Sequence, residues 1–151
     1  MDEKDQIGEV EAFSLFGEPL FRASLRPETE EQQKALYEDA IKNYEANPEG
    51  VDEIVWLGRR TAYLGRYREA AAIFSEGLKM HPDEPKLLRH RGHRFITLRR
   101  FDLATEDLGK ASKLIKGKPD GVEPDGIPNE RNTPVSSLHF NIWYHLGLAH
   151  Y

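Results

Sequence analysis

Apolar side chains recur along the middle of the chain at the three-to-four-residue spacing of one helix face. From residue 54 onward they form two consecutive runs, the first around Leu57 and the second around Phe74. Gly65 lies between the runs, where a chain reversal favours a residue that tolerates a positive φ. Pro82 follows the second run and cannot continue a helix. The pattern therefore predicts two antiparallel helices joined by a short turn.

The same pattern returns after 34 residues. Gly58 is matched by Gly92, and small, aromatic, aliphatic and proline positions match around them. The other matched pairs are Pro48 and Pro82, Leu64 and Leu98, Tyr67 and Phe101, Ala70 and Ala104, Phe74 and Leu108, and Gly77 and Ala111. A period kept at this many positions indicates a repeat protein whose helices approach closely at the small residues.

These positions resemble the tetratricopeptide repeat, a helix pair of 34 residues that carries Leu-Gly, Tyr, Ala, Phe, Ala and Pro at fixed places. The first repeat meets the pattern at Ile54, Leu57, Gly58, Tyr67, Ala70, Phe74, Gly77, Leu78 and Pro82. The second, from residue 85 to about 117, keeps Leu88, Gly92, Phe95, Phe101, Ala104, Leu108 and Ala111. The resemblance implies an all-α fold, an α-solenoid in which helix-turn-helix repeats form a right-handed superhelix.

Register with the repeats divides the chain into four segments. Residues 1–26 hold aromatic residues around a Gly and a Pro, and we expect an irregular cap whose aromatics pack over the first helix. Residues 27–117 comprise a half-repeat helix followed by two repeats. Residues 118–137 are a loop, rich in Pro and Gly, inserted between helix pairs. Residues 138–151 match the first helix of a truncated third repeat.

The last two segments each leave alternatives open. The insert is either an ordered flap that contributes to a binding surface or a structural or mobile loop. The final helix either belongs to a longer array or serves as a terminal cap. We expect one of its sides to pack on the second repeat through Phe140, Trp143, Leu146 and Gly147. Some of Ile142, Tyr144, Leu148 and Tyr151 should then face outward, and we expect a homodimer through this helix.

Arg91 is the main departure from the pattern, because it stands in the second repeat where Leu57 stands in the first. We expect its aliphatic stem to pack and its guanidinium to reach an acid on the facing helix, with Glu106 and Asp107 as candidates. On that basis Arg91→Leu should preserve or raise the melting temperature.

Charged residues are unevenly distributed, although the formal charge of the whole chain is only −5. Residues 1–53 hold ten more acidic than basic side chains, whereas residues 54–101 hold seven more basic than acidic ones. Two interpretations of the basic middle stay open. It is either a set of solvated helix faces or a surface for an acidic partner, for which the chain's own N-terminal segment is one candidate.

Length and composition place the chain in a broad class. With 151 residues, 38% apolar and 31% charged, it is typical of one globular domain. The absence of Cys excludes disulfides and thiol catalysis. The sequence contains neither a secretory signal nor an apolar run near the roughly 20 residues of a membrane span, so we expect a cytoplasmic protein without membrane contact.

Candidate catalytic and metal-binding groups are few. His90 and His93 have the spacing of metal ligands on a helix, but the neighbouring arginines would repel a cation and no matched carboxylate is near. The acidic residues near position 120 lack the regular alternation of a calcium loop. The sequence also contains no phosphate-binding glycine loop and no nucleophile elbow. We therefore expect no enzyme activity, no cofactor and no metal.

The resemblance instead implies a groove. In tetratricopeptide proteins the first helix of each pair forms a concave wall, and residues beside the Leu-Gly pair point into it. Carried over by phase, the groove positions are Val55, Arg59, Tyr63, Arg89, His93, Thr97, Tyr144 and Leu148. Arginine supplies planar donors for a carboxylate and tyrosine supplies contact area, which suits an acidic peptide.

We therefore expect a non-enzymatic module that binds a peptide segment of another protein, and the acidic segment is favoured. Two other function classes stay open. One is a regulatory or substrate-recruiting domain of a larger enzyme. The other is a helical repeat that binds RNA through the basic stretch at residues 89–94, against which the negative overall charge and the few aromatics beside the arginines argue.

Overall fold

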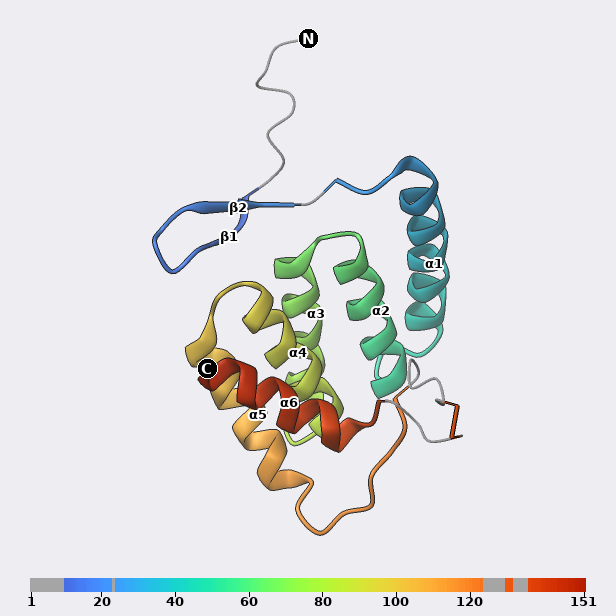
Figure 1. Ribbon diagram of the computed structural model, residues 1–151. Coiled ribbons are helices and arrows are strands. Elements are labelled where there is room, and N and C mark those ends of the chain that lie inside the picture. Colours follow the sequence, from blue (N-terminus) through green and yellow to red (C-terminus); the bar gives the residue numbers. More distant parts are fainter. Residues whose placement is uncertain (1–9, 23, 124–129, 132–135) are drawn as a thin grey trace.

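The computed structural model describes residues 10–22, 24–123, 130–131 and 136–151. Within these ranges, two short strands precede six helices (Figure 1). The elements are β1 (Val10–Phe13), β2 (Pro19–Phe21), α1 (Pro27–Ala46), α2 (Val51–Tyr63), α3 (Tyr67–Met80), α4 (Pro85–Thr97), α5 (Phe101–Leu114) and α6 (Leu138–His150). The predicted all-α repeat fold is confirmed, and a β-hairpin is added to it.

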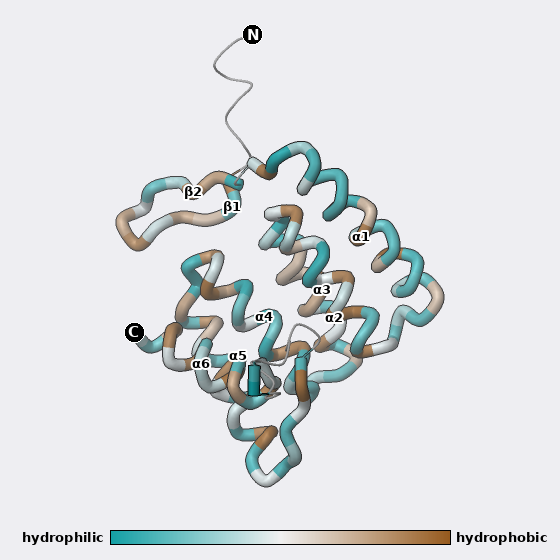
Figure 2. Tube along the Cα trace, turned by 45° about the vertical axis from the view of Figure 1, so that its right-hand side comes forward, coloured by the Kyte–Doolittle hydropathy of each residue, from teal (hydrophilic) through white to brown (hydrophobic). Residues whose placement is uncertain are grey.

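The helices stack as two pairs, α2 with α3 and α4 with α5, with α1 on one side and α6 on the other (Figure 1). In addition to the contacts within pairs, α2 contacts α4 and α4 contacts α6. The first helices of successive repeats therefore form one continuous wall. Hydrophobic and hydrophilic positions alternate along the helices of the two pairs (Figure 2), so each of α2, α3, α4 and α5 buries one face against its neighbours.

Two glycines explain the close approach within each pair. A Cβ atom added to Gly58 on α2 would overlap the ring of Phe74 on α3, and one added to Gly92 on α4 would overlap the Leu108 side chain on α5. Phe74 and Leu108 are almost completely buried. The repeated Gly and large apolar residue are thus two halves of the same contact, which sets the distance between the helices of a pair.

The turns within the two pairs share a backbone conformation but not a residue type. Gly65 has φ +76° between α2 and α3, and Arg99, 34 residues later, has φ 61° between α4 and α5. A side chain is disfavoured in this left-handed region because the Cβ atom crowds the backbone. The second turn therefore keeps the geometry of the first at the expense of local strain.

The N-terminal prediction is wrong, because residues 10–21 form a hairpin rather than an irregular cap on the first helix. Ser14 Oγ accepts the backbone N–H groups of Phe16 and Glu18, and Gly17 has φ +79°, which closes the turn. Glu11 is buried. Its carboxylate accepts a hydrogen bond from Arg22 Nη2 at 2.6 Å and another from the backbone N–H of Arg68 at 3.3 Å. These polar contacts tie the hairpin to the α2–α3 turn.

The hairpin aromatics are not packed over α1. Phe13, Leu15, Phe16 and Phe21 are all exposed, Phe16 to 94%. A three-residue strand paired with a four-residue one has little inner face, so the polar anchor at Glu11 rather than aromatic burial determines where the hairpin lies.

The predicted contact of the Arg91 guanidinium with an acid on the facing helix is confirmed, with Asp107 as that acid. Arg91 Nε and Nη2 lie 2.7 Å from Asp107 Oδ2 and Oδ1 respectively, and Nη1 donates to Ser75 Oγ at 3.2 Å. The guanidinium also lies 5.5 Å from the centre of the Phe95 ring. Asp107 is buried and the Arg91 side chain is 24% exposed, so a fork-shaped ion pair joins α4 to α5 at the edge of the interior.

The predicted packing face of α6 is wrong by part of a turn. Ile142 is completely buried and His145 nearly so, whereas Trp143 and Phe140 are more than half exposed, and no atom lies within 4 Å of a Cβ placed on Gly147. The face that Gly58 and Gly92 use within their pairs is therefore open on α6. The helix instead uses the face directed at α4 and α5, which it contacts. Tyr144, Leu148 and Tyr151 are exposed as expected.

No helix in the described part of the chain combines the length and the apolar character that crossing a membrane requires.

Candidate functional site: an arginine cavity on the helical wall

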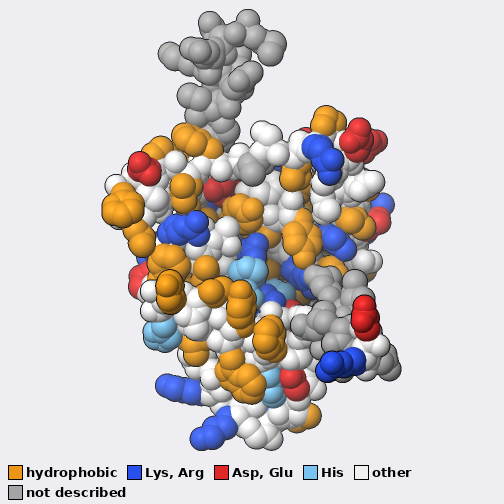
Figure 3. Space-filling model, viewed as in Figure 1, with side chains coloured by type: hydrophobic (Ala, Val, Ile, Leu, Met, Phe, Trp, Pro, Cys, Tyr) orange, Lys and Arg blue, Asp and Glu red, His pale blue; other side chains and the backbone are white. Residues whose placement is uncertain are grey.

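A cavity of about 170 Å³ lies on the wall formed by the first helices of the repeats, and we call it the arginine cavity. Figure 3 shows histidine and arginine side chains at the centre of this face, surrounded by hydrophobic ones. The lining residues are Arg59, Ala62, Tyr63, Phe74, Arg89, His90, His93, Arg94, Glu123 and Ser136. The cavity therefore draws on α2, α3, α4 and the insert.

Helical spacing places the polar lining residues. Arg59 and Tyr63 are four residues apart on α2, and Arg89 and His93 are four apart on α4, so each pair shares a face of its helix. Arg59 and His93 are also one repeat apart, and α2 contacts α4. The 34-residue period thus brings the two pairs to the same cavity.

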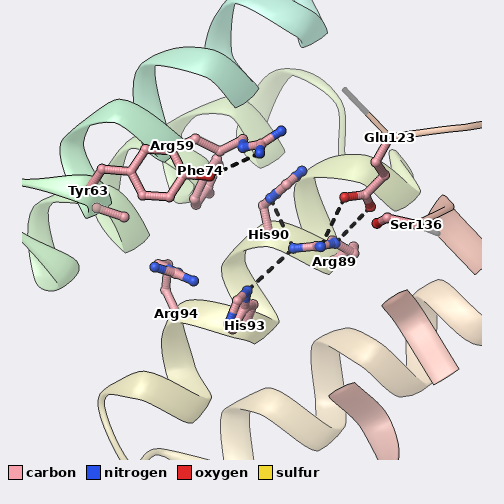
Figure 4. Close-up of a pocket in the computed structure, with 10 residues that line it drawn as sticks. Arg59, Tyr63, Phe74, Arg89, His90, His93, Arg94, Glu123 and Ser136 are labelled. Atoms are coloured by element: carbon pink, nitrogen blue, oxygen red, sulfur yellow. Dashed lines mark hydrogen bonds and ion pairs between the residues drawn. The ribbon is translucent and has the colours of Figure 1, made fainter. Parts of the chain in front are cut away.

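Arg89 is the centre of the polar network (Figure 4). Its Nη2 donates to Glu123 Oε2 at 2.9 Å, and its Nε lies 2.9 Å from Glu123 Oε1. On the other side its Nη1 lies 3.2 Å from His90 Nδ1 and 3.4 Å from His93 Nδ1. Arg89 and Glu123 are 7% and 8% exposed, so this ion pair is largely removed from water.

The histidines act as neutral acceptors. An arginine only donates hydrogen bonds, so Nδ1 of His90 and His93 must carry a lone pair and the proton lies on Nε2. Burial, followed by the charge of Arg89, holds the pKa of His90 well below its ordinary value. Burial and the charge of Arg94 lower the pKa of His93 to about 2. Both rings are therefore neutral at neutral pH and add no positive charge to the cavity.

A third histidine connects the cavity to α6. The rings of His93 and His145 have centroids 4.1 Å apart. His145 Nδ1 lies 2.7 Å from the Asn141 carbonyl oxygen, which can only accept, so Nδ1 carries the proton. Burial lowers the pKa of His145 to about 4. Neutral rings can pack at this distance, whereas two charged rings would repel each other.

Arg59 and Arg94 bring two further cations to the cavity. Arg59 Nη2 donates to Tyr63 Oη at 3.0 Å, and its guanidinium lies 4.7 Å from the centre of the Trp56 ring. The guanidinium of Arg94 lies 5.7 Å from the centre of the Tyr67 ring. Burial and the charge of Arg89 lower the pKa of Arg94 to about 10. The cavity therefore places guanidinium groups in surroundings that disfavour charge.

The insert is held in place at Glu123 and at the two residues before it. The backbone N–H of Glu123 donates to Ser136 O at 3.3 Å, and Val122 pairs with Ser137 as an antiparallel bridge. The N–H of Leu138 donates to Gly121 O at 2.8 Å. The two arms of the insert therefore lie side by side next to the start of α6, and this pairing directs the Glu123 side chain at Arg89 (Figure 4).

The start of α6 is part of the same construction. Ser137 Oγ accepts the N–H of Phe140 at 3.3 Å as the N-cap, and Asp120 Oδ1 accepts the N–H of His139 at 3.0 Å. Two free N–H groups of the first turn are thus satisfied, both of them by side chains of the insert. These hydrogen bonds hold the insert in a fixed position relative to the first turn of α6.

The predicted groove residues fall into two groups. Arg59, Tyr63, Arg89 and His93 all line the arginine cavity. The others do not. Val55 belongs to the buried core, because its side chain packs within the cluster around Ile54 and Phe74. Thr97 lies one turn beyond His93 and donates to the His93 carbonyl oxygen at 3.2 Å, while Tyr144 and Leu148 are exposed on α6.

Sequence reasoning missed several lining residues, chiefly His90, Arg94, Glu123 and Ser136. His90 and Arg94 belong to the same basic stretch as Arg89, and helical spacing from Arg89 and His93 was a signal that could have included them. Glu123 had no such signal, because it lies in the insert, where the repeat period does not apply.

A metal centre gains no support from the described residues, where no three His, Cys, Asp or Glu side chains are placed to hold an ion. His90 and His93 instead direct their Nδ1 atoms at Arg89.

Comparison with protein-family models gives no match to this chain, and neither does comparison with curated proteins. Among solved structures it is similar to PcrH from Pseudomonas aeruginosa, with 20% sequence identity, a TM-score of 0.53, and coverage of 85% of this chain and 96% of that one. It is also similar to PcrH in complex with the chaperone binding region of PopD, with 22% identity, a TM-score of 0.55, and coverage of 84% and 95%. At these identities the likeness shows a helical repeat fold, which agrees with the resemblance to tetratricopeptide repeats at the level of fold.

Proposed function

We propose that the chain is a non-enzymatic interaction protein of the tetratricopeptide type, which holds a segment of a partner protein against the wall formed by α2, α4 and α6. The stacked repeats supply such a wall, and the arginine cavity opens on it. PcrH, which has the same fold, is described in complex with the chaperone binding region of PopD. A fold alone does not fix a function, so the chemistry of the cavity has to supply the preference for a partner.

The bound segment carries an acidic side chain that enters the arginine cavity. The observation behind this is the contact between Arg89 and Glu123, in which the cavity already accommodates a carboxylate that accepts a hydrogen bond from Nη2 and lies 2.9 Å from Nε. Guanidinium groups match carboxylates in geometry, and the neutral histidines leave the positive charge to the arginines. Tyr144 and Leu148, exposed on α6, extend the surface with apolar area for the rest of the segment.

A displayed library of random peptides tests this function. Selection on the wild-type protein should enrich acidic sequences, and the selected peptides should bind more weakly as ionic strength rises and the Debye length falls below about 8 Å. The double variant Arg59→Gln, Arg89→Gln should lose these peptides, because both changes remove a cation from the cavity.

Arg60→Gln is the matched control. Arg60 neighbours Arg59 on α2, but it lies outside the arginine cavity, 4.8 Å from the centre of the Trp56 ring. This variant should bind the selected peptides as the wild type does. Selection of peptides without acidic residues, or equal loss in the Arg60 variant, would rule out the arginine cavity as the binding site.

A second observation favours self-association through α6. Trp143 and Gly147 occupy the repeat positions of Ile54 and Gly58, which are buried against α3, yet Trp143 is 57% exposed and the space over Gly147 is open. A second copy covers this face by a two-fold symmetric contact in which each Trp143 packs near the Gly147 of the other chain. We propose a homodimer formed in this way.

A further inference from the structure

Glu123 reaches the arginine cavity from a segment that is not part of any repeat. Its carboxylate contacts Arg89, which lies 34 residues away in the sequence, and both side chains are almost fully buried. Paired backbone on the two arms of the insert holds it there, through the N–H of Glu123 to Ser136 O and the bridge between Val122 and Ser137. Such a contact is far more defined than an ion pair between mobile surface side chains.

The contact also occupies the donors that a bound carboxylate needs. Arg89 donates Nη2 to Glu123 and directs Nη1 at two imidazole rings, while its Nε is buried 2.9 Å from Glu123 Oε1 without forming a hydrogen bond. The Glu123 carboxylate thus covers the Nε and Nη2 edge of the guanidinium. An acidic side chain from another protein therefore cannot form a two-pronged contact with Arg89 while Glu123 is in place. Exchange of one carboxylate for another keeps the buried guanidinium paired, whereas a neutral group would leave it uncompensated.

Arg94 offers a contact that Glu123 does not use. It lines the same cavity, one turn beyond His90, and its side-chain contact in the structure is with the face of Tyr67. Among the described residues no carboxylate forms an ion pair with it. A segment with two acidic groups can therefore reach Arg94 with one and compete for Arg89 with the other.

We propose that Glu123 is a built-in competitor for the partner: an acidic segment binds by taking Arg89 from Glu123, with Arg94 as its second contact. This inference rests on the proposed function, because it concerns the same cavity. It makes the insert a regulator of the site. Binding loosens the hold of Glu123 on α4, and any change that withdraws Glu123 opens the cavity to acidic ligands.

Glu123→Gln is the variant that tests the competition, with a fluorescein-labelled pentaglutamate peptide as the probe and pentaglutamine as its neutral counterpart. Fluorescence anisotropy should show about tenfold tighter binding of pentaglutamate to this variant than to the wild type, because an amide competes poorly for a guanidinium. Pentaglutamine should bind neither protein. Adding Arg89→Gln to the variant should abolish the gain.

Glu130→Gln is the matched control, because it removes the same charge from an exposed position in the same insert. Its affinity for pentaglutamate should stay at the wild-type value. Tighter binding to both variants would mean that the insert acts only through its net charge, which overturns the proposal. Equal binding to the wild type and to the Glu123 variant, with loss in Arg89→Gln, would overturn the competition and leave the proposed function standing.

Hydrogen exchange on the wild type keeps the test independent of whether Glu123→Gln folds. Saturating pentaglutamate should speed exchange of the backbone N–H of Glu123, which donates to Ser136 O, and of Leu138, which donates to Gly121 O. The core amides of α2 serve as the reference. Probe binding that leaves exchange at Glu123 and Leu138 unchanged, or slows it, would show that the insert is not displaced. Equal binding to the wild type and Arg89→Gln would instead reject the arginine cavity as the site.

Discussion

Arg91 and Asp107 form a two-pronged ion pair between α4 and α5, with both N–O distances at 2.7 Å. One repeat earlier the same two positions hold Leu57 and Ile73. Two chemically different pairs thus occupy equivalent places in the two repeats. The ion pair has to offset the desolvation of both groups, which an apolar pair does not.

This relationship changes the expectation for Arg91→Leu. Asp107 is 5% exposed, so the single change leaves a buried carboxylate without its cation and should lower the free energy of unfolding by about 3 kcal/mol. The double variant Arg91→Leu, Asp107→Ile copies the first repeat and should be at least as stable as the wild type. Urea denaturation of the three proteins measures both effects. A single variant as stable as the wild type would mean that Asp107 finds another partner or water.

The left-handed turn residue Arg99 gives a second prediction. Arg99→Gly should raise the free energy of unfolding by about 0.5 to 1 kcal/mol, because the strain at φ 61° disappears and outweighs the added freedom of the unfolded chain. Gly65→Ala at the matched turn should have the opposite effect, since it introduces that strain and crowds the Arg22 side chain. Denaturation midpoints measure both. Destabilisation by Arg99→Gly would show that the Arg99 side chain itself holds the turn.

The buried histidines predict a loss of stability in mild acid. The pKa of His145 is lowered to about 4 and that of His93 to about 2, both chiefly by burial, and that of His90 is lowered well below its usual value. Below pH 6.5 the unfolded chain binds protons at these rings that the folded chain does not bind. The free energy of unfolding is therefore highest above pH 6.5 and falls as the pH drops from there toward 4, by on the order of 1 kcal/mol per pH unit for each ring.

Chemical denaturation at pH 7 and pH 5 measures this slope. His145→Asn should reduce the dependence of the unfolding free energy on pH by about the contribution of one histidine. His150→Asn, at an exposed position on the same helix, should leave this dependence unchanged. A slope that His145→Asn does not alter would show that His145 takes up its proton in the folded protein near the usual pH.

The helix pairs were predictable because their signals are local. Gly58 and Gly92 predicted a close approach of helices, and the structure shows that Phe74 and Leu108 make it. The repeat period placed Arg59 and His93 on one wall. Alignment of the two repeats also made Asp107 one of the candidate partners of Arg91. In each case the residues lie within one helix pair or one 34-residue period apart, so their spacing in the sequence is enough to bring them together.

The errors arose where contacts depend on the path of the chain. The insert has no period, so nothing in the sequence placed Glu123 on Arg89. On α6, matching Gly147 to Gly58 identified the right positions but the wrong environment, since no described helix packs over Gly147 as α3 packs over Gly58. Ile142 and His145 are buried instead, because they face α4 and α5.

The open face of α6 carries the last prediction. Trp143 is 57% exposed, whereas Ile54, at the equivalent position of the first repeat, is only 1% exposed. Full burial of a side chain of this size stabilises a contact by roughly 1.5 to 3 kcal/mol. Two copies that cover each other's Trp143 and Gly147 should therefore associate as the concentration rises, which sedimentation velocity measures.

Trp143→Glu should keep the chain monomeric without changing its fold, because the Trp143 side chain contributes little to the hydrophobic core. Phe16→Glu is the control for general apolar adhesion, since Phe16 is 94% exposed at the hairpin tip, and it should leave association unchanged. A wild-type chain that stays monomeric at millimolar concentration, or a Trp143 variant that still dimerises, would exclude this contact.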